Sequence, residues 1–225
     1  MSFSNEHLTR QMDLIPMEIL GEQITIIGAG AIGSWTTLAL AKMGFTNLTV
    51  YDHDKVSIEN MNSQFYRLKD IGNHKVQALA EMTHDFTGHW ITGYAKKYES
   101  GMFPGTVISA VDSMEVRKLI WENHKNKAFG CRAVIDPRMG AESALLYVMN
   151  PLDSKDIESY EKTLYVDTQA VQERCTARAT IYTANLLSGL VCKAVKDLLT
   201  RPDYLRSAQW SIANNDFLAF TKKAS

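Results

Sequence analysis

A glycine cluster between an apolar run and a helical pattern constrains the fold of this chain more than any other feature. The apolar run covers residues 23–27 and is rich in β-branched side chains, and residues 28–33 then read Gly-Ala-Gly-Ala-Ile-Gly. Apolar residues recur at helical spacing as far as Met43, and a second apolar run at 48–51 ends on Asp52. This succession of strand, glycine turn, helix, strand and acid is typical of a nucleotide-binding βαβ unit.

Each glycine of the cluster has a mechanical reason. Gly28 allows a tight turn, Gly30 lets the backbone approach a phosphate, and Gly33 allows the helix to pack closely on the strand. The amide groups at the start of the helix favour an anion. Asp52 stands where a carboxylate accepts hydrogen bonds from both ribose hydroxyls.

The polar segment that follows Asp52 distinguishes between kinds of nucleotide. Asn60 and Gln64 supply amide groups there, and Arg67 and Lys75 supply cations. A dehydrogenase has no need for such groups directly after its ribose acid, whereas a site for a triphosphate requires them. We therefore expect a nucleoside triphosphate at this site.

The stretch from residues 8–11, Leu-Thr-Arg-Gln, to the helix after Cys175 resembles a known family. It is similar to the adenylation domain of ubiquitin-activating-type enzymes, which include the adenylyltransferases of the thiamin and molybdopterin sulfur carriers and a tRNA-modifying dehydratase. The resemblance implies adenylation, with ATP and Mg²⁺, of a C-terminal glycine carboxylate. By this resemblance, the carboxylate is that of a small ubiquitin-like or sulfur-carrier protein that ends in Gly-Gly. The resemblance also implies a homodimer.

The motif and the resemblance together assign the nucleotide site, in which Lys75 and Arg67 neutralise phosphate charge. The residues expected to bind the nucleotide are Gly28, Gly30, Ala31, Ile32, Gly33, Asp52, Asp54, Asn60, Gln64 and Lys75.

Three more residues have a role implied by the resemblance and a plainer alternative. Arg10 would reach the partner subunit's ATP site, or it is an ordinary surface arginine. Asp112 follows a predicted strand and would hold Mg²⁺, or it is a helix N-cap. Cys175 would bond covalently to the carrier, as in some sulfur-carrier enzymes, or it has no such role, as in other members that do not depend on this cysteine. The helix start and the flanking Arg174 and Arg178 would lower the pKa of its thiol.

One position departs from the family pattern. Residues 60–64 read Asn-Met-Asn-Ser-Gln, so Ser63 stands where the family has a phosphate-binding arginine. The replacement removes a bidentate phosphate contact. Either Arg67, one helical turn further on, compensates, or the chain is a weakened or non-catalytic member.

Three other functions stay open. The residues Gly33-Ser34-Trp35 resemble the tRNA-modifying dehydratase branch, although no basic patch supports it. A nicotinamide-dependent oxidoreductase would need a hydride-site residue, and none is evident. A non-catalytic partner subunit would bind carriers without consuming ATP.

Composition excludes several classes of protein. A net charge of -1 provides no broad basic field for nucleic acid, and no apolar run approaches the roughly 20 residues that span a bilayer. The N-terminus lacks a secretory pattern, so we expect a cytoplasmic protein. None of the three cysteines forms a CxxC pair, so no zinc is expected, unlike in many sulfur-carrier adenylyltransferases.

The 225 residues predict one α/β domain, with a Rossmann-like, mostly parallel sheet flanked by helices and antiparallel strands added in the C-terminal half. We expect an N-terminal helix within 1–20, a helix over 70–83, strands at 128–135 and 144–149, and a turn at 136–140. A polar crossover-type loop over 150–175 and a terminal hairpin within 203–225 complete the prediction.

Overall fold

The fold is one mixed sheet of eight strands in the order β3-β2-β1-β4-β5-β6-β7-β8. The computed structural model describes residues 5–127, 130–164 and 179–221. Strands β1 to β5 pair in parallel, and β5 to β8 pair antiparallel, which confirms the predicted sheet. The strands are β1 (Ile24–Ile27), β2 (Leu48–Tyr51), β3 (Thr92–Tyr94), β4 (Gly105–Ser109), β5 (Cys131–Gly140), β6 (Ser143–Met149), β7 (Leu205–Ser211) and β8 (Asp216–Thr221).

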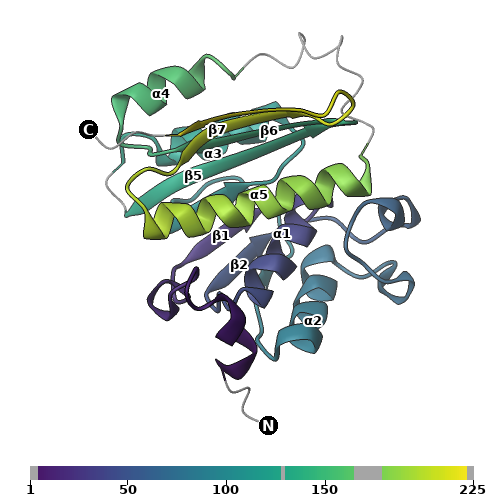
Figure 1. Ribbon diagram of the computed structural model, residues 1–225. Helices are drawn as coiled ribbons and strands as arrows, with labels where there is room; N and C mark the ends of the chain where they lie inside the picture. The colour runs from purple at the N-terminus through teal and green to yellow at the C-terminus, as the bar shows by residue number, and fades with distance from the viewer. Residues whose placement is uncertain (1–4, 128–129, 165–178, 222–225) are drawn as a thin grey trace.

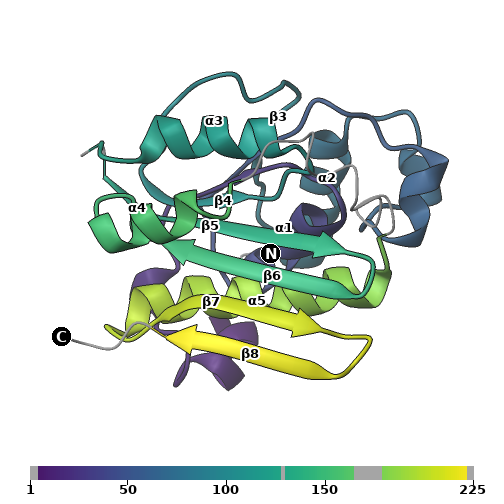
Figure 2. The same ribbon diagram turned by 90° about the horizontal axis from the view of Figure 1, so that it is seen from above.

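Helices cover both faces of the sheet (Figure 1). Figure 2 shows α3 and α4 on one side of the strands and α5 on the other. Helices α1 and α2 lie on the α5 side, where the three helices and the sheet bury a common apolar core. The α-helices are α1 (Ala31–Lys42), α2 (Lys75–Thr87), α3 (Met114–His124), α4 (Ser154–Glu161) and α5 (Ile181–Thr200).

The second core lies under α3 and α4. Trp121 of α3 is fully buried there, and its ring meets Tyr160 of α4 edge-on at 4.8 Å. Because β4 and β5 have a core on each face, successive residues are buried in both strands, as Val107 and Ile108 of β4 and Val134 and Ile135 of β5 show.

The N-terminal segment differs from the single helix expected within residues 1–20. Two short 3-10 helices, Asn5–Gln11 and Met17–Ile19, occupy it. Pro16 precedes the second one in an extended conformation, and a proline cannot continue a helix from the preceding turn. Leu8 in the first of these helices and Leu20, which directly follows the second, are buried.

The turn predicted at residues 136–140 is wrong, because β5 continues through them to Gly140. Strand β4 pairs with β5 only as far as Ile135, so Pro137 lies beyond its reach. Its missing N–H therefore leaves no ladder bond unmade on that side, while β6 pairs with the other edge. The chain turns at residues 141–142 instead.

Two other boundaries also differ from prediction. The helix expected from residue 70 begins at Lys75, after a short 3-10 helix, Leu68–Asp70. The polar segment from 150 contains α4, whose start is capped by the side chain of Asp153.

At the C-terminal end of the described chain, β7 and β8 form an antiparallel hairpin, and every residue of β8 is exposed. Within the described residues, no helix has both the length and the apolar character that crossing a bilayer requires.

Candidate functional site

The carboxyl ends of β1, β2 and β4 meet at one edge of the sheet. Ile27 lies beside Tyr51 on one side and beside Ser109 on the other. The glycine turn, Asp52 and the loop that leads to Asp112 follow these three strand ends. In open parallel sheets, ligands bind at such an edge.

The glycine turn is built so that two of its glycines cannot be replaced. Gly28 has a φ of +99°, and a Cβ on it would lie 2.3 Å from the carbonyl oxygen of Ala110. A Cβ on Gly33 would lie 1.9 Å from the carbonyl oxygen of Gly28, so α1 packs against the turn too closely for a side chain at this position. Gly30 has open space where a Cβ would lie and forms the N-cap of α1. Backbone amides at such a helix start face an anion without obstruction.

Asp52 fastens the turn to the second strand. Its Oδ2 accepts a hydrogen bond from the Ala29 amide at 2.6 Å, and its Oδ1 accepts one from the Asp54 amide at 2.7 Å. The Tyr66 hydroxyl donates to the Ala29 carbonyl at 2.7 Å, so both backbone polar groups of Ala29 are held. Burial, with the nearby charge of Asp52, raises the pKa of Tyr66 well above its ordinary value, and the hydroxyl stays a donor.

Lys75 brings a buried cation to the same edge. Its side chain is 7% exposed, and its ammonium donates to Oδ2 of Asp54 at 2.9 Å. Burial alone would raise the pKa of Asp54, but the hydrogen bond and charge of Lys75 lower it. The carboxylate of Asp54 is itself half exposed, so a second anion has access to the pair. His53 lies 3.3 Å from the other oxygen of Asp54.

The two side-chain amides predicted to orient a ligand differ in whether their oxygens already accept a hydrogen bond. Asn60 uses its Oδ1 to accept from the Ser57 amide at 3.0 Å, which caps a 3-10 helix, Ile58–Asn62. The Oε1 of Gln64 is buried and has no hydrogen-bond partner among the described residues. A buried polar atom without a partner is uncommon and calls for one.

Ser63, at the position of the missing arginine, is buried and packs against α1. Its carbonyl accepts a hydrogen bond from the Trp35 indole at 3.0 Å, and the Phe65 amide donates to the Ser34 hydroxyl at 3.0 Å. The Trp35 and Phe65 rings lie 4.6 Å apart. Sequence reasoning missed this attachment, although a tryptophan at the start of the helix was its one visible signal.

Arg67 is surrounded by acids. Its guanidinium binds Asp70 through two donors, at 2.8 and 2.9 Å, and contacts Asp85 at 3.1 Å and Glu81 at 3.3 Å. These carboxylates balance its charge in the structure. A phosphate contact from Arg67 would have to replace some of them.

Asp112 and Arg10 are both exposed. The Ser113 hydroxyl caps α3 by accepting from the Val116 amide at 3.3 Å, so Asp112 is not used as that cap. The backbone at Arg10 is held by its neighbours. Leu8 is buried, and the side-chain amide of Gln11 donates to the Met43 carbonyl at 2.6 Å. No described residue forms a hydrogen bond or ion pair with the Arg10 side chain.

The thiols separate into two groups. Cys175 lies outside the described residues. Cys131 and Cys192 are buried, which raises the pKa of each thiol to about 12. Both are therefore poor nucleophiles at neutral pH.

Comparison with known proteins gives three findings. A model described as "ThiF family" matches residues 17–222. Ubiquitin-like modifier-activating enzyme 5 of Drosophila virilis is 31% identical over 121 residues, which are 45% of this chain and 30% of that protein. The chain thus aligns with under a third of this relative's length.

Solved structures share the fold at low sequence identity. The crystal structure of PaaA has a TM-score of 0.75 and 16% identity over 99% of this chain and 74% of that one. The structure of Escherichia coli MccB with ATP has a TM-score of 0.73 and 12% identity over 96% of this chain and 71% of that one. At such identity these neighbours bear on the fold alone.

Proposed function

Because the chain belongs to the ThiF family, we propose that it is an adenylyltransferase that activates a carboxylate with ATP. A carboxylate oxygen attacks the α-phosphorus of ATP, the bond to the β-phosphate bridging oxygen breaks, and pyrophosphate leaves. The product is an acyl adenylate. This step asks the protein for alignment and charge neutralisation more than for covalent chemistry.

One observation carries the proposal. At the edge where three parallel strands end, an open glycine turn, the carboxylate of Asp52 that holds this turn and the buried ammonium of Lys75 lie together. The turn holds phosphates through its amides, Asp52 holds the ribose, and Lys75 contacts a phosphate oxygen. Gln64, with its unpartnered oxygen, orients a donor group of the nucleotide or a water.

The charges at this edge explain the need for further cations. Asp52, Asp54 and Asp112 bring three carboxylates to this edge, whose charge the buried ammonium of Lys75 offsets only in part, so a bound triphosphate requires further cations. Mg²⁺ suits the exposed carboxylate of Asp112, since it prefers oxygen ligands, and when bound it neutralises phosphate charge. Arg10, which has no described partner within its own chain, supplies a cation to the site of a second copy.

The substrate we propose is the C-terminal glycine of a small ubiquitin-like or sulfur-carrier protein that ends in Gly-Gly. Its support is the printed name of the Drosophila virilis relative, an activating enzyme for a ubiquitin-like modifier. The acyl group can then pass to Cys175: the thiolate attacks the acyl carbon, AMP leaves, and a thioester forms.

Exchange of labelled pyrophosphate into ATP tests the adenylation. With a candidate carrier and Mg²⁺, the wild-type protein should catalyse exchange, and Lys75→Met should lower the rate by about 10²- to 10³-fold, as loss of one charge-stabilising donor does. Lys162 is an exposed lysine at the C-cap of α4, and Lys162→Met is the matched control that should keep the wild-type rate. Absence of exchange with carriers that bind the protein would contradict the proposal.

A second candidate function has one observation in its favour. Ser63 replaces the family's arginine and is buried, while the charge of Arg67 is balanced by acids. A non-catalytic partner subunit would show this pattern. It would bind a carrier in calorimetry, and neither exchange nor carrier binding would respond to Lys75→Met.

A further inference from the structure

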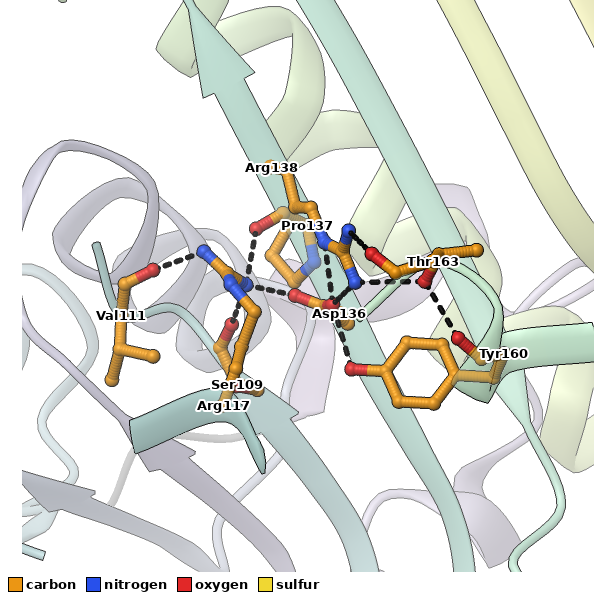
Figure 3. Close-up of polar contacts among 8 residues, drawn as sticks. All are labelled: Ser109, Val111, Arg117, Asp136, Pro137, Arg138, Tyr160 and Thr163. Atoms are coloured by element: carbon orange, nitrogen blue, oxygen red, sulfur yellow. Dashed lines mark hydrogen bonds and ion pairs between the residues drawn. The ribbon is translucent and has the colours of Figure 1, made fainter. Parts of the chain in front are cut away.

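A buried cluster of charged groups joins β5 to α3 and α4 (Figure 3). Asp136, in the middle of β5 and directly after the last residue that pairs with β4, has no exposed surface and pairs with both Arg117 of α3 and Arg138. The Tyr160 hydroxyl of α4 donates to its Oδ2 at 2.8 Å, and Arg138 Nε donates to the same oxygen at 2.8 Å. We name these four residues the Asp136 network.

Arg117 connects the network to the end of β4. Its guanidinium donates to the Ser109 carbonyl at 3.3 Å and also to the Val111 carbonyl. These carbonyls belong to the segment immediately before Asp112. With its other contact on the Asp136 carboxylate, Arg117 fixes the backbone that carries Asp112 (Figure 3).

Arg138 holds the network from the opposite side. It donates to the Thr163 carbonyl at 2.9 Å and to the Thr163 hydroxyl at 3.0 Å, just beyond α4. Its guanidinium also lies 4.8 Å from the centre of the Tyr147 ring. Asp136 is thus held by three groups from β5, α3 and α4, which leaves its carboxylate little freedom to move.

Such a cluster is an expensive way to fill a core. Taking one carboxylate and two guanidinium groups out of water costs several kcal/mol per ion, and well-packed apolar residues often give equal or better stability. The Asp136 network fixes the backbone directly before Asp112. Residues that hold a metal are commonly fixed by such rigid supporting groups.

We propose that Asp136 is a positioning residue which, through Arg117, holds the carboxylate of Asp112 in place for a divalent cation. The inference rests on the proposed function of the site. Asp136 itself touches neither nucleotide nor metal. Its effect reaches Asp112 through the backbone from Ser109 to Val111.

Direct metal binding tests this independently of catalysis. Binding of Mn²⁺ to the full chain, without added nucleotide whose phosphates would take up the ion, is measured by the loss of the free-ion electron paramagnetic resonance signal. Asp136→Asn should raise the Mn²⁺ dissociation constant about 10- to 100-fold, the usual effect of removing a group that supports a metal ligand. Combined with Asp112→Asn, it should add no further loss, because both changes act on one ligand.

Asp156→Asn is the matched control. Asp156 is also a buried carboxylate at α4, 3% exposed, and pairs with Arg206. This variant should lower the melting temperature as Asp136→Asn does and leave Mn²⁺ affinity unchanged. Asp136→Asn that loses stability with Mn²⁺ affinity within twofold of wild type would overturn the proposal.

Two further outcomes are also decisive. If Asp136→Asn does not fold, Tyr160→Phe removes one hydrogen bond to the same carboxylate and should weaken Mn²⁺ binding about two- to fivefold. No change in that variant would overturn the proposal. Wild-type protein that binds no Mn²⁺ also overturns it, whereas absence of pyrophosphate exchange with Mn²⁺ bound counts only against the proposed reaction.

Discussion

Lys75 shows how much a single side chain does at this edge of the sheet. A buried ammonium is costly unless an acid accompanies it, and Asp54 fills that role from a half-exposed position. In the proposed function, a phosphate that enters from solvent meets a cation already in place, with the half-exposed acid beside it. Lys75 would then contribute to the stability of the empty site and to phosphate binding.

The three cysteines lead to a prediction for native thiol labelling. Cys131 and Cys192 are buried, and burial raises the pKa of each thiol to about 12, so few thiolates exist at pH 8. We expect iodoacetamide to modify at most one cysteine of the folded protein, Cys175, and all three after denaturation. Mass spectrometry of intact protein counts the adducts.

Cys175→Ser is the control for this labelling and should leave the native protein unmodified. Rapid native labelling of Cys131 or Cys192 would contradict the burial of these two thiols.

At the scale of elements, local residue patterns predicted the strands and helices that form from consecutive residues. The unit from β1 to Asp52 was recognisable because each step, from apolar run to glycine turn to helix, has its own residue pattern. Pro137 was misread as a turn because its tolerance in β5 depends on where β4 ends, which only the assembled sheet determines. The short α4 had a signal in Asp153, a good N-cap, that the acidic composition concealed.

The candidate site divides in the same way. Gly28, Gly33, Asp52 and Lys75 were predictable because motif spacing sets their positions. The Asp136 network was not, since it joins residues of α3, β5 and α4 that are up to 43 positions apart in sequence, between Arg117 and Tyr160. No local pattern marks which buried arginine faces which buried acid.

The ion pair between Asp70 and Arg67 leads to a pH prediction. Burial would raise the pKa of Asp70, but hydrogen bonds from Arg67 lower it below its ordinary value. An acid with a lowered folded pKa stabilises the fold fully above its unfolded pKa, about 3.9, and loses that effect as the pH falls through the folded value. Asp70→Asn should therefore be less stable than wild type at pH 7, by about 1–2 kcal/mol, and the difference should shrink below pH 4.

Urea unfolding at a series of pH values measures that difference. Glu158→Gln alters an exposed pair with Lys162 and should follow the wild-type curve. A deficit of Asp70→Asn that stays constant down to pH 2 would mean that the ionised form of Asp70 contributes nothing.

At the scale of the whole molecule, the proposed exchange of Arg10 between two copies predicts complementation. Arg10→Ala and Lys75→Met should each abolish most exchange alone. If Arg10 acts on the partner's site, a mixed dimer has one site with both changes and one with neither. Random mixing then restores about a quarter of wild-type activity, since half the dimers are mixed and each has one intact site.

Exchange activity of the mixture, with sedimentation to count subunits, provides the measurement. Mixing two preparations of Arg10→Ala is the control and should restore nothing. Activity that stays at the level of the separate variants, in a protein shown to be dimeric, would place Arg10 in its own chain's site or outside any site.

The double pairing of β5 restricts how the gene can change in length. Successive side chains of a strand alternate between faces, so loss of one codon early in β5 would turn Asp136 towards the apolar α5 side and shift its pairing with β6. Neither neighbouring strand could follow such a slip without losing its own register. Insertions and deletions in this half of the coding sequence are therefore tolerable only at the tips of connections, such as residues 212–215 between β7 and β8.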